Sequence, residues 1–109
     1  MLEPIFGNAT VEKILFFLET YGKGYATGLA KLFKIPVNGI QQQLKRLEDG
    51  GIVVGVMAGR TRLYQFNPRY AFLKELRQLI QRAIQFLPEK EIEKYYRNRT
   101  RPRRKGKPL

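Results

Sequence analysis

The side chains best suited to bind another molecule lie in the segment NGIQQQLKR, between residues 38 and 46. Asparagine and glutamine can pair with N6 and N7 of adenine, and arginine and lysine can pair with O6 and N7 of guanine, in the major groove of DNA. These residue types therefore favour base recognition over bond-breaking chemistry. The predicted DNA-contacting residues of this segment are Asn38, Gln41, Gln42, Lys45 and Arg46.

A second cationic group follows in the segment AGRTR, where Arg60 and Arg62 lie at a predicted turn. An arginine on the tip of a hairpin can neutralise a phosphate or enter a narrow minor groove. We predict that both arginines contact DNA. The other interpretation is that they are surface charges without a ligand, and that glutamines 41–43 form a solvated helix face.

The third cationic group is at the C-terminal end, where residues 97–109 contain seven basic residues and no acid. The first 96 residues contain 14 basic and 9 acidic residues, so they hold only +5 of the chain's net charge of +12. Because this end has too little apolar surface to fold, we predict a disordered basic tail. Its predicted DNA-contacting residues are Arg101, Arg103, Arg104 and Lys105. The alternative is a tail that serves solubility alone.

The chain contains neither cysteine nor histidine. It therefore has no disulfide and no thiolate nucleophile, and it lacks the commonest general base and the usual zinc ligands. The acidic residues are spaced as on solvated helix faces, with no glycine-rich or apolar pocket signature around them. We expect no enzymatic activity, no metal site and no cofactor.

The length of 109 residues suits a single domain. The longest purely apolar run, Ile14 to Leu18, has five residues, whereas a membrane-spanning helix needs about 20. The sequence also lacks the features of a secretory signal. We therefore expect a cytoplasmic, nucleoid-associated protein that does not contact membranes.

Three helices are predicted to position the amides. Asn8 is a suitable N-cap for a helix over residues 9–21, where apolar residues recur at helical spacing and glycines follow. A shorter helix is predicted over 27–34, and it ends before Pro36 because the residue before a proline avoids helical geometry. Proline tolerates the start of a helix, so a third helix is predicted over 36–49. Its apolar side holds Val37, Ile40, Leu44 and Leu47, opposite most of the amides and cations.

A hairpin over residues 53–66 is predicted next, because two runs rich in β-branched and aromatic residues enclose the turn 58–61. A long helix is predicted over 70–87, followed by a short charged helix over 88–96. The long helix has an apolar seam with coiled-coil-like spacing, which we predict to be a homodimer interface. Its residues are Leu73, Leu76, Ile80, Ala83 and Leu87. The alternative is that the seam packs on the first helix within one chain. A second strip, Phe72, Leu79 and Phe86, repeats every seven residues.

The predicted fold is mainly α with a small β-hairpin. Two short helices joined by a tight turn, the second exposing amides and cations, form a helix-turn-helix, whose second helix lies in the major groove. The hairpin then corresponds to a wing on the DNA backbone or in the minor groove. The predicted domain covers residues 1–87 and includes the dimerisation helix over 70–87. The charged helix and the basic tail follow it in the sequence.

The run from Leu29 to Pro68, LAKLFKI…I…QLKRLEDGGIV…GRTRLYQFNP, resembles the winged helix-turn-helix of the ArsR-like transcriptional regulators. The stretches IFGNAT, IPVNGI and NPRYAFLKELRQLI are similar to winged-helix segments that precede a nucleotidyltransferase domain, and the resemblance covers about residues 5–87. It implies a DNA-binding protein. Metal-sensing members use cysteine or histidine ligands that this chain lacks, and no catalytic residues match.

These observations predict a sequence-specific transcriptional regulator that binds double-stranded DNA as a homodimer. Two recognition helices held one helical turn apart increase specificity on a palindrome. One alternative is an architectural or chromatin-type protein that binds DNA without sequence preference, which the basic tail would suit. Another is a protein-interaction module that partners a nucleotidyltransferase. RNA binding is a weaker alternative, because no sheet with stacking aromatics is predicted.

Overall fold

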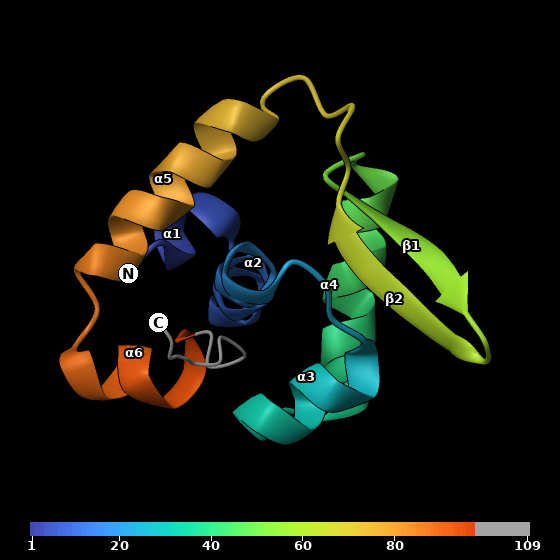
Figure 1. Ribbon diagram of the computed structural model, residues 1–109, viewed down its shortest axis with the longest axis horizontal. Coiled ribbons are helices and arrows are strands. Elements are labelled where there is room, and N and C mark those ends of the chain that lie inside the picture. Colours follow the sequence, from blue (N-terminus) through green and yellow to red (C-terminus); the bar gives the residue numbers. More distant parts are fainter. Residues whose placement is uncertain (98–109) are drawn as a thin grey trace, which may run out of the picture.

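The computed structural model describes residues 1–97, which form six helices and a two-stranded antiparallel sheet (Figure 1). This confirms a mainly helical chain with a small β-hairpin. The elements are α1 (Glu3–Phe6), α2 (Ala9–Tyr21), α3 (Ala26–Phe33), α4 (Val37–Asp49), β1 (Val53–Ala58), β2 (Thr61–Phe66), α5 (Leu73–Gln85) and α6 (Glu89–Tyr95).

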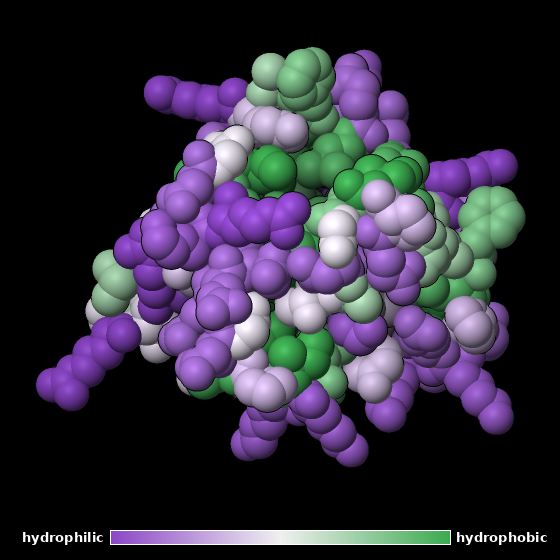
Figure 2. All heavy atoms as spheres, turned by 180° about the vertical axis from the view of Figure 1, so that it is seen from behind, coloured by the Kyte–Doolittle hydropathy of each residue, from purple (hydrophilic) through white to green (hydrophobic). Residues whose placement is uncertain are grey.

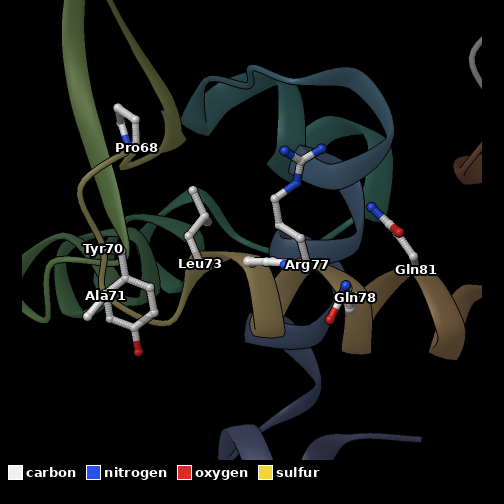
Figure 3. Close-up of a pocket in the computed structure, with 8 residues that line it drawn as sticks. Pro68, Tyr70, Ala71, Leu73, Arg77, Gln78 and Gln81 are labelled. Carbon is white, nitrogen blue, oxygen red and sulfur yellow. The ribbon is translucent and has the colours of Figure 1, made fainter.

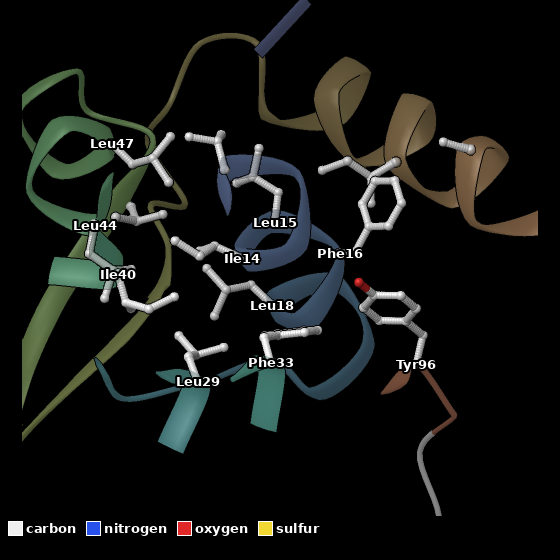
Figure 4. Packing of buried hydrophobic residues seen from close by; sticks show 14 residues of the cluster. Ile14, Leu15, Phe16, Leu18, Leu29, Phe33, Ile40, Leu44, Leu47 and Tyr96 are labelled. Atoms are coloured by element: carbon white, nitrogen blue, oxygen red, sulfur yellow. The ribbon is translucent and has the colours of Figure 1, made fainter. Parts of the chain in front are cut away.

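Helix α2 is the centre of the fold, with α5 on one side and α3, α4 and the hairpin on the other (Figure 1). The predicted N-cap is confirmed, because the side chain of Asn8 accepts a hydrogen bond of 2.8 Å from the backbone N–H of Val11. Unlike a surface helix, α2 is buried on several sides, and the core is built around it (Figure 4). Its least exposed residues are Ile14, Leu15, Phe16 and Leu18.

Helices α3 and α4 are joined by a tight turn at Lys34, whose φ of 58° lies in the left-handed region. The backbone N–H of Lys34 bonds the carbonyl of Ala30, so the turn also satisfies a free carbonyl at the end of α3. Pro36 is the N-cap of α4. The two helices therefore occur within one residue of their predicted bounds at each end, in contact with each other.

The hairpin pairs Val53 with Phe66 at its base and Ala58 with Thr61 at its tip. Gly24, between α2 and α3, adds a short third pairing on the free edge of β2. Its N–H donates to the carbonyl of Tyr64 at 3.0 Å, and the N–H of Tyr64 donates back at 2.7 Å. This bridge connects the middle of β2 to the segment just before α3 and so holds the hairpin against that helix.

Helix α5 is shorter than predicted, because an Asn67–Pro68 turn delays its start. Its apolar seam packs on α2 inside the chain, with Ile80 0% and Ala83 5% exposed. Leu76 and Leu87 pack against the same core. The seam was predicted to be a dimer interface, but its central residues are covered by the chain itself. The alternative, packing within one chain, describes these residues.

Helix α6 brings Tyr96 into the core, which its charged sequence did not predict. The ring of Tyr96 is 6% exposed and meets Phe16 edge-on at 5.6 Å between ring centroids. It also contacts Phe33 of α3, 6.1 Å away. Burial raises the pKa of Tyr96 well above the usual value for a tyrosine. The C-terminal part of the described chain therefore helps to hold α2 and α3 together.

Candidate nucleic-acid interface

Helix α4 has one buried face and one exposed face, and the exposed face holds most of the predicted base-contacting side chains. Ile40 and Leu44 are fully buried and Leu47 is 6% exposed, so these three side chains fix the rotation of α4 against the core. Because helical side chains repeat every 3.6 residues, that rotation turns another set outward. The exposed set is Asn38, Gln41, Gln42 and Lys45.

These exposed side chains line one shallow depression of about 280 Å³ on the surface of α4. Within residues 1–97, the amides of Asn38, Gln41 and Gln42 make no hydrogen bond, so their donors and acceptors are available to a ligand. Lys45 pairs with Asp49 at 3.0 Å, but both side chains are well exposed. An exposed pair contributes little to stability, so Lys45 can exchange this partner for a base or a phosphate.

Arg46 does not join this set. Its guanidinium donates to Gln43 Oε1 at 3.1 Å and to the carbonyl of Phe6, in α1, at 3.3 Å. It also lines an apolar hollow of about 380 Å³ together with Ile5 and Leu76. These contacts direct Arg46 toward α1 and away from the four exposed side chains of α4, and its contact with DNA stays a prediction.

Arg62, which was predicted to contact DNA, is exposed but forms an ion pair within the chain. Its guanidinium donates to Glu48 Oε2 of α4 at 2.7 Å, and the backbone N–H of Gly55 donates to the same oxygen at 3.3 Å. The hydrogen bond and charge of Glu48 raise the pKa of Arg62. Arg62 also lies over the ring of Tyr64, 5.7 Å from its centroid. One carboxylate therefore connects α4 to both strands of the hairpin.

Gly55 makes this connection possible, because a Cβ at this position would lie only 2.4 Å from Nε of Arg62. A larger residue in β1 would displace the arginine from Glu48. An isolated glycine within a strand is often a place where another group approaches closely. That glycine is the one sequence signal that could have predicted the contact, whereas nothing in the sequence identified Glu48 as the partner.

Arg60 remains the exposed cation of the hairpin, with no ion pair among residues 1–97. It follows Gly59, whose φ of 66° suits the first position of a two-residue hairpin turn. The turn therefore spans residues 58–61 as predicted, with Gly59 and Arg60 as its two central residues at the tip. Of the two predicted arginines, the structure leaves only Arg60 without an acidic partner.

A second hollow of about 320 Å³ joins the hairpin to α4 and to the start of α3. Arg60, Arg62 and Gln41 line it, and Gln41 also lines the depression on α4. The exposed amides and the hairpin cations therefore belong to one continuous surface. Tyr25 and Thr27 of the α3 region also line this hollow. The sequence did not predict these two residues because neither belongs to a motif.

The basic residues Arg101, Arg103, Arg104 and Lys105 lie outside the described residues. Elsewhere, a hollow of about 560 Å³ lies beside α5, lined by Tyr70, Lys74, Arg77 and Gln81 among others (Figure 3). Arg77 and Gln81 extend from α5 and bond the carboxylate of Glu19 in α2, at 2.8 Å each. The lining includes no carboxylate, so this hollow does not assemble a pair of acids for general acid–base chemistry.

Among residues 1–97, no group of acidic side chains is arranged to hold a metal ion, and no helix is long and apolar enough to cross a membrane. No family model, curated protein or solved structure matches this chain. The arrangement of charges, amides and hollows is therefore the basis on which function is inferred.

Proposed function

We propose that this protein is a sequence-specific DNA-binding transcriptional regulator that acts as a homodimer. In this proposal α3 and α4 are a helix-turn-helix, α4 lies in the major groove, and the β1–β2 hairpin is a wing on the backbone or in the minor groove. The order of these elements is that of the ArsR-like winged helix-turn-helix that the sequence resembles.

One observation supports the proposal above all others: three unbonded amides and Lys45 share an exposed helix face that is continuous, through Gln41, with the cationic hairpin. Amides can pair with adenine and Lys45 with guanine when the helix lies in the groove. A phosphate backbone running beside that groove would then meet Arg60. An unliganded solvated face would not need this continuity with a cationic tip.

A dimer follows from the small size of the surface. A single short helix contacts few base pairs, whereas two copies on an inverted repeat combine their contacts. Half-sites whose centres are about one helical turn apart, roughly 10 base pairs, are expected for recognition helices related by a two-fold axis.

The proposal is tested by selecting bound duplexes from a random pool with the purified chain. We expect enrichment of an inverted repeat. The double variant Gln41→Ala/Gln42→Ala should lose that enrichment yet still bind DNA at low salt, since phosphate contacts remain. Its matched control is Gln78→Ala/Gln85→Ala, which removes two exposed amides from α5 and should enrich the same repeat.

The other outcomes separate the alternatives. Binding without any enriched sequence would favour an architectural protein, which uses phosphate contacts alone. No binding to duplex DNA at low salt would contradict the proposal and favour a protein-interaction module. Enrichment that survives the α4 variant would show that another surface recognises the bases.

A further inference from the structure

Three large apolar side chains of the α5 region project into solvent. Phe72 is 64% exposed, Leu79 is 39% exposed and Phe86 is 65% exposed. Seven residues separate each from the next, so they form a strip along one side of the helix. Viewed from behind, apolar atoms project at the upper and right-hand margins of the molecule, where α5 lies (Figure 2). The buried seam of α5 therefore has a second, uncovered apolar strip beside it.

The strip has the sequence geometry of a helix–helix contact. Counting heptad positions with Phe72, Leu79 and Phe86 at d places Leu76 and Ala83 at a, and these two residues belong to the seam that packs on the chain's own core. Tyr70 extends the apolar surface, because its ring meets that of Phe72 edge-on at 5.9 Å.

Two opposite charges border the strip on its other side, Glu75 and Arg82, both at heptad position g. Neither forms an ion pair within residues 1–97, although Arg82 lies over the ring of Phe86 at 5.3 Å from its centroid. Because they are seven residues apart on one helix, about 10 Å along its axis, they do not reach each other. Among the described residues, each of these two charges is therefore without an oppositely charged partner.

We propose that a second copy of this chain packs on the strip, with the two α5 helices antiparallel and a two-fold axis at Leu79. Phe72 then faces the partner's Phe86, Leu79 faces the partner's Leu79, and Glu75 pairs with the partner's Arg82. Every contact occurs twice, as a two-fold interface requires. This inference deepens the proposed function, because it defines the surface that makes the regulator a homodimer.

The charges select this orientation. In an antiparallel pair, g positions of the two helices face each other, so both acid–base pairs form together. In a parallel pair, Glu75 would instead face Ile80 of the partner, a residue that is buried in its own chain. A single helix pair buries less than the standard interface of about 1,600 Å², so we expect a dimer with a micromolar dissociation constant.

Single cysteines test the geometry, because the natural chain has none. Under mild oxidation, Leu79→Cys should form a disulfide-linked dimer. Phe72→Cys and Phe86→Cys should not link to themselves, since the two copies of each lie about 21 Å apart along the pair, whereas a disulfide needs Cα atoms within about 7 Å. An equal mixture of the Phe72→Cys and Phe86→Cys chains should link to each other. Self-linking at 72 or 86, or no linking at 79, would overturn the proposal.

Sedimentation of charge variants tests the chemistry. Arg82→Glu places two acids opposite each other and should weaken dimerisation at least tenfold. The double variant Glu75→Arg/Arg82→Glu should restore the dimer, a rescue that a role within one chain would not produce. Leu79→Glu should give a folded monomer by circular dichroism, whereas the control Gln78→Glu should remain a dimer. A persistent Leu79→Glu dimer, or no rescue by the double variant, would overturn the interface.

No DNA is present in these assays, so their outcome is independent of the test of function. A chain that fails to pair through α5 could still select a DNA sequence. A chain that pairs as described but selects no DNA sequence would support the α5 interface and contradict the proposed function as a sequence-specific regulator.

Discussion

At the scale of single residues, the two hairpin arginines have different environments despite their similar sequence positions. Arg62 crosses the strand at Gly55 and pairs with Glu48 of α4 at 2.7 Å. Arg60 extends from the tip without an acidic partner among residues 1–97. The first arginine links the hairpin to α4 through a partly exposed ion pair, and the second is available to a phosphate.

This difference predicts unequal effects on DNA binding. Arg60→Ala should reduce affinity on all duplexes and lower the slope of log affinity against log salt by about one, as expected for one lost phosphate contact. Arg62→Ala should change that slope less, because its charge is already paired. Salt titrations of both variants on random duplex measure this, and equal slope changes would contradict the distinction.

The buried Tyr96 ring predicts a dependence of stability on pH. Its pKa is raised in the folded chain, mainly by burial, whereas in the unfolded chain a tyrosine titrates near about 10. The stabilising effect of the neutral ring is therefore complete below pH 10 and decreases as pH rises further, because only the unfolded state readily loses the proton.

Urea denaturation at several pH values from about 8 to 11 measures this decrease. Tyr96→Phe keeps the packing of the ring but lacks the ionisable hydroxyl group. The stability of this variant should therefore decline less over this range. Tyr25 is 46% exposed, so Tyr25→Phe is the control, and its stability should decline with pH as that of the wild type does. Parallel declines for wild type and Tyr96→Phe would contradict the assignment.

At the scale of elements, helical spacing predicted α2, α3 and α4 to within a residue, because apolar periodicity, an asparagine cap and a proline agreed with one another. It did not predict α1, which is a single turn, or the burial of Tyr96, which depends on tertiary packing. Spacing also identified both apolar strips of α5. It could not determine which of them the chain covers, since this depends on where α2 lies.

The two strips of α5 predict opposite effects on stability. Ile80 is fully buried, so Ile80→Ala should reduce the free energy of unfolding by about 2–5 kcal/mol. Phe86→Ala, at a ring 65% exposed in the single chain, should change the monomer's stability by less than about 0.5 kcal/mol. Urea denaturation in dilute solution, where the chain is monomeric, measures both. Similar losses would contradict the division of α5 into a core face and a free face.

At the scale of the whole molecule, the sequence predicted four neighbouring side chains of the candidate surface, because the α4 helix alone determines which residues share its face. It did not predict the contacts that Arg46 and Arg62 make within the chain, because their partners lie 40 and 14 residues away in the sequence. Sequence patterns record spacing within an element, whereas these contacts depend on how elements pack. The continuity between α4 and the hairpin is likewise a property of the folded chain.

The basic residues beyond 97 predict a further dependence on salt. This segment contains six of the chain's 21 basic residues and no acid. Deleting residues 98–109 should reduce the salt slope by roughly 2–5, because each neutralised phosphate contributes about 0.9 and a basic chain does not use every cation at once. The sequence preference should survive, since phosphate contacts do not distinguish bases. Salt titrations of intact and truncated chains measure this, and an unchanged slope would show that these cations do not contact DNA.

The central claim is that the exposed face of α4 recognises bases, and the most direct measurement is the ratio of affinities for a selected duplex and a shuffled duplex at physiological salt. The account predicts a ratio of about 10³ or more. It also predicts that Gln42→Ala reduces this ratio roughly fivefold to 150-fold, which corresponds to about 1–3 kcal/mol for one lost base contact. The exposed α5 variant Gln85→Ala should leave the ratio unchanged. A wild-type ratio near one, or a ratio that Gln42→Ala and Gln85→Ala alter equally, would contradict the account.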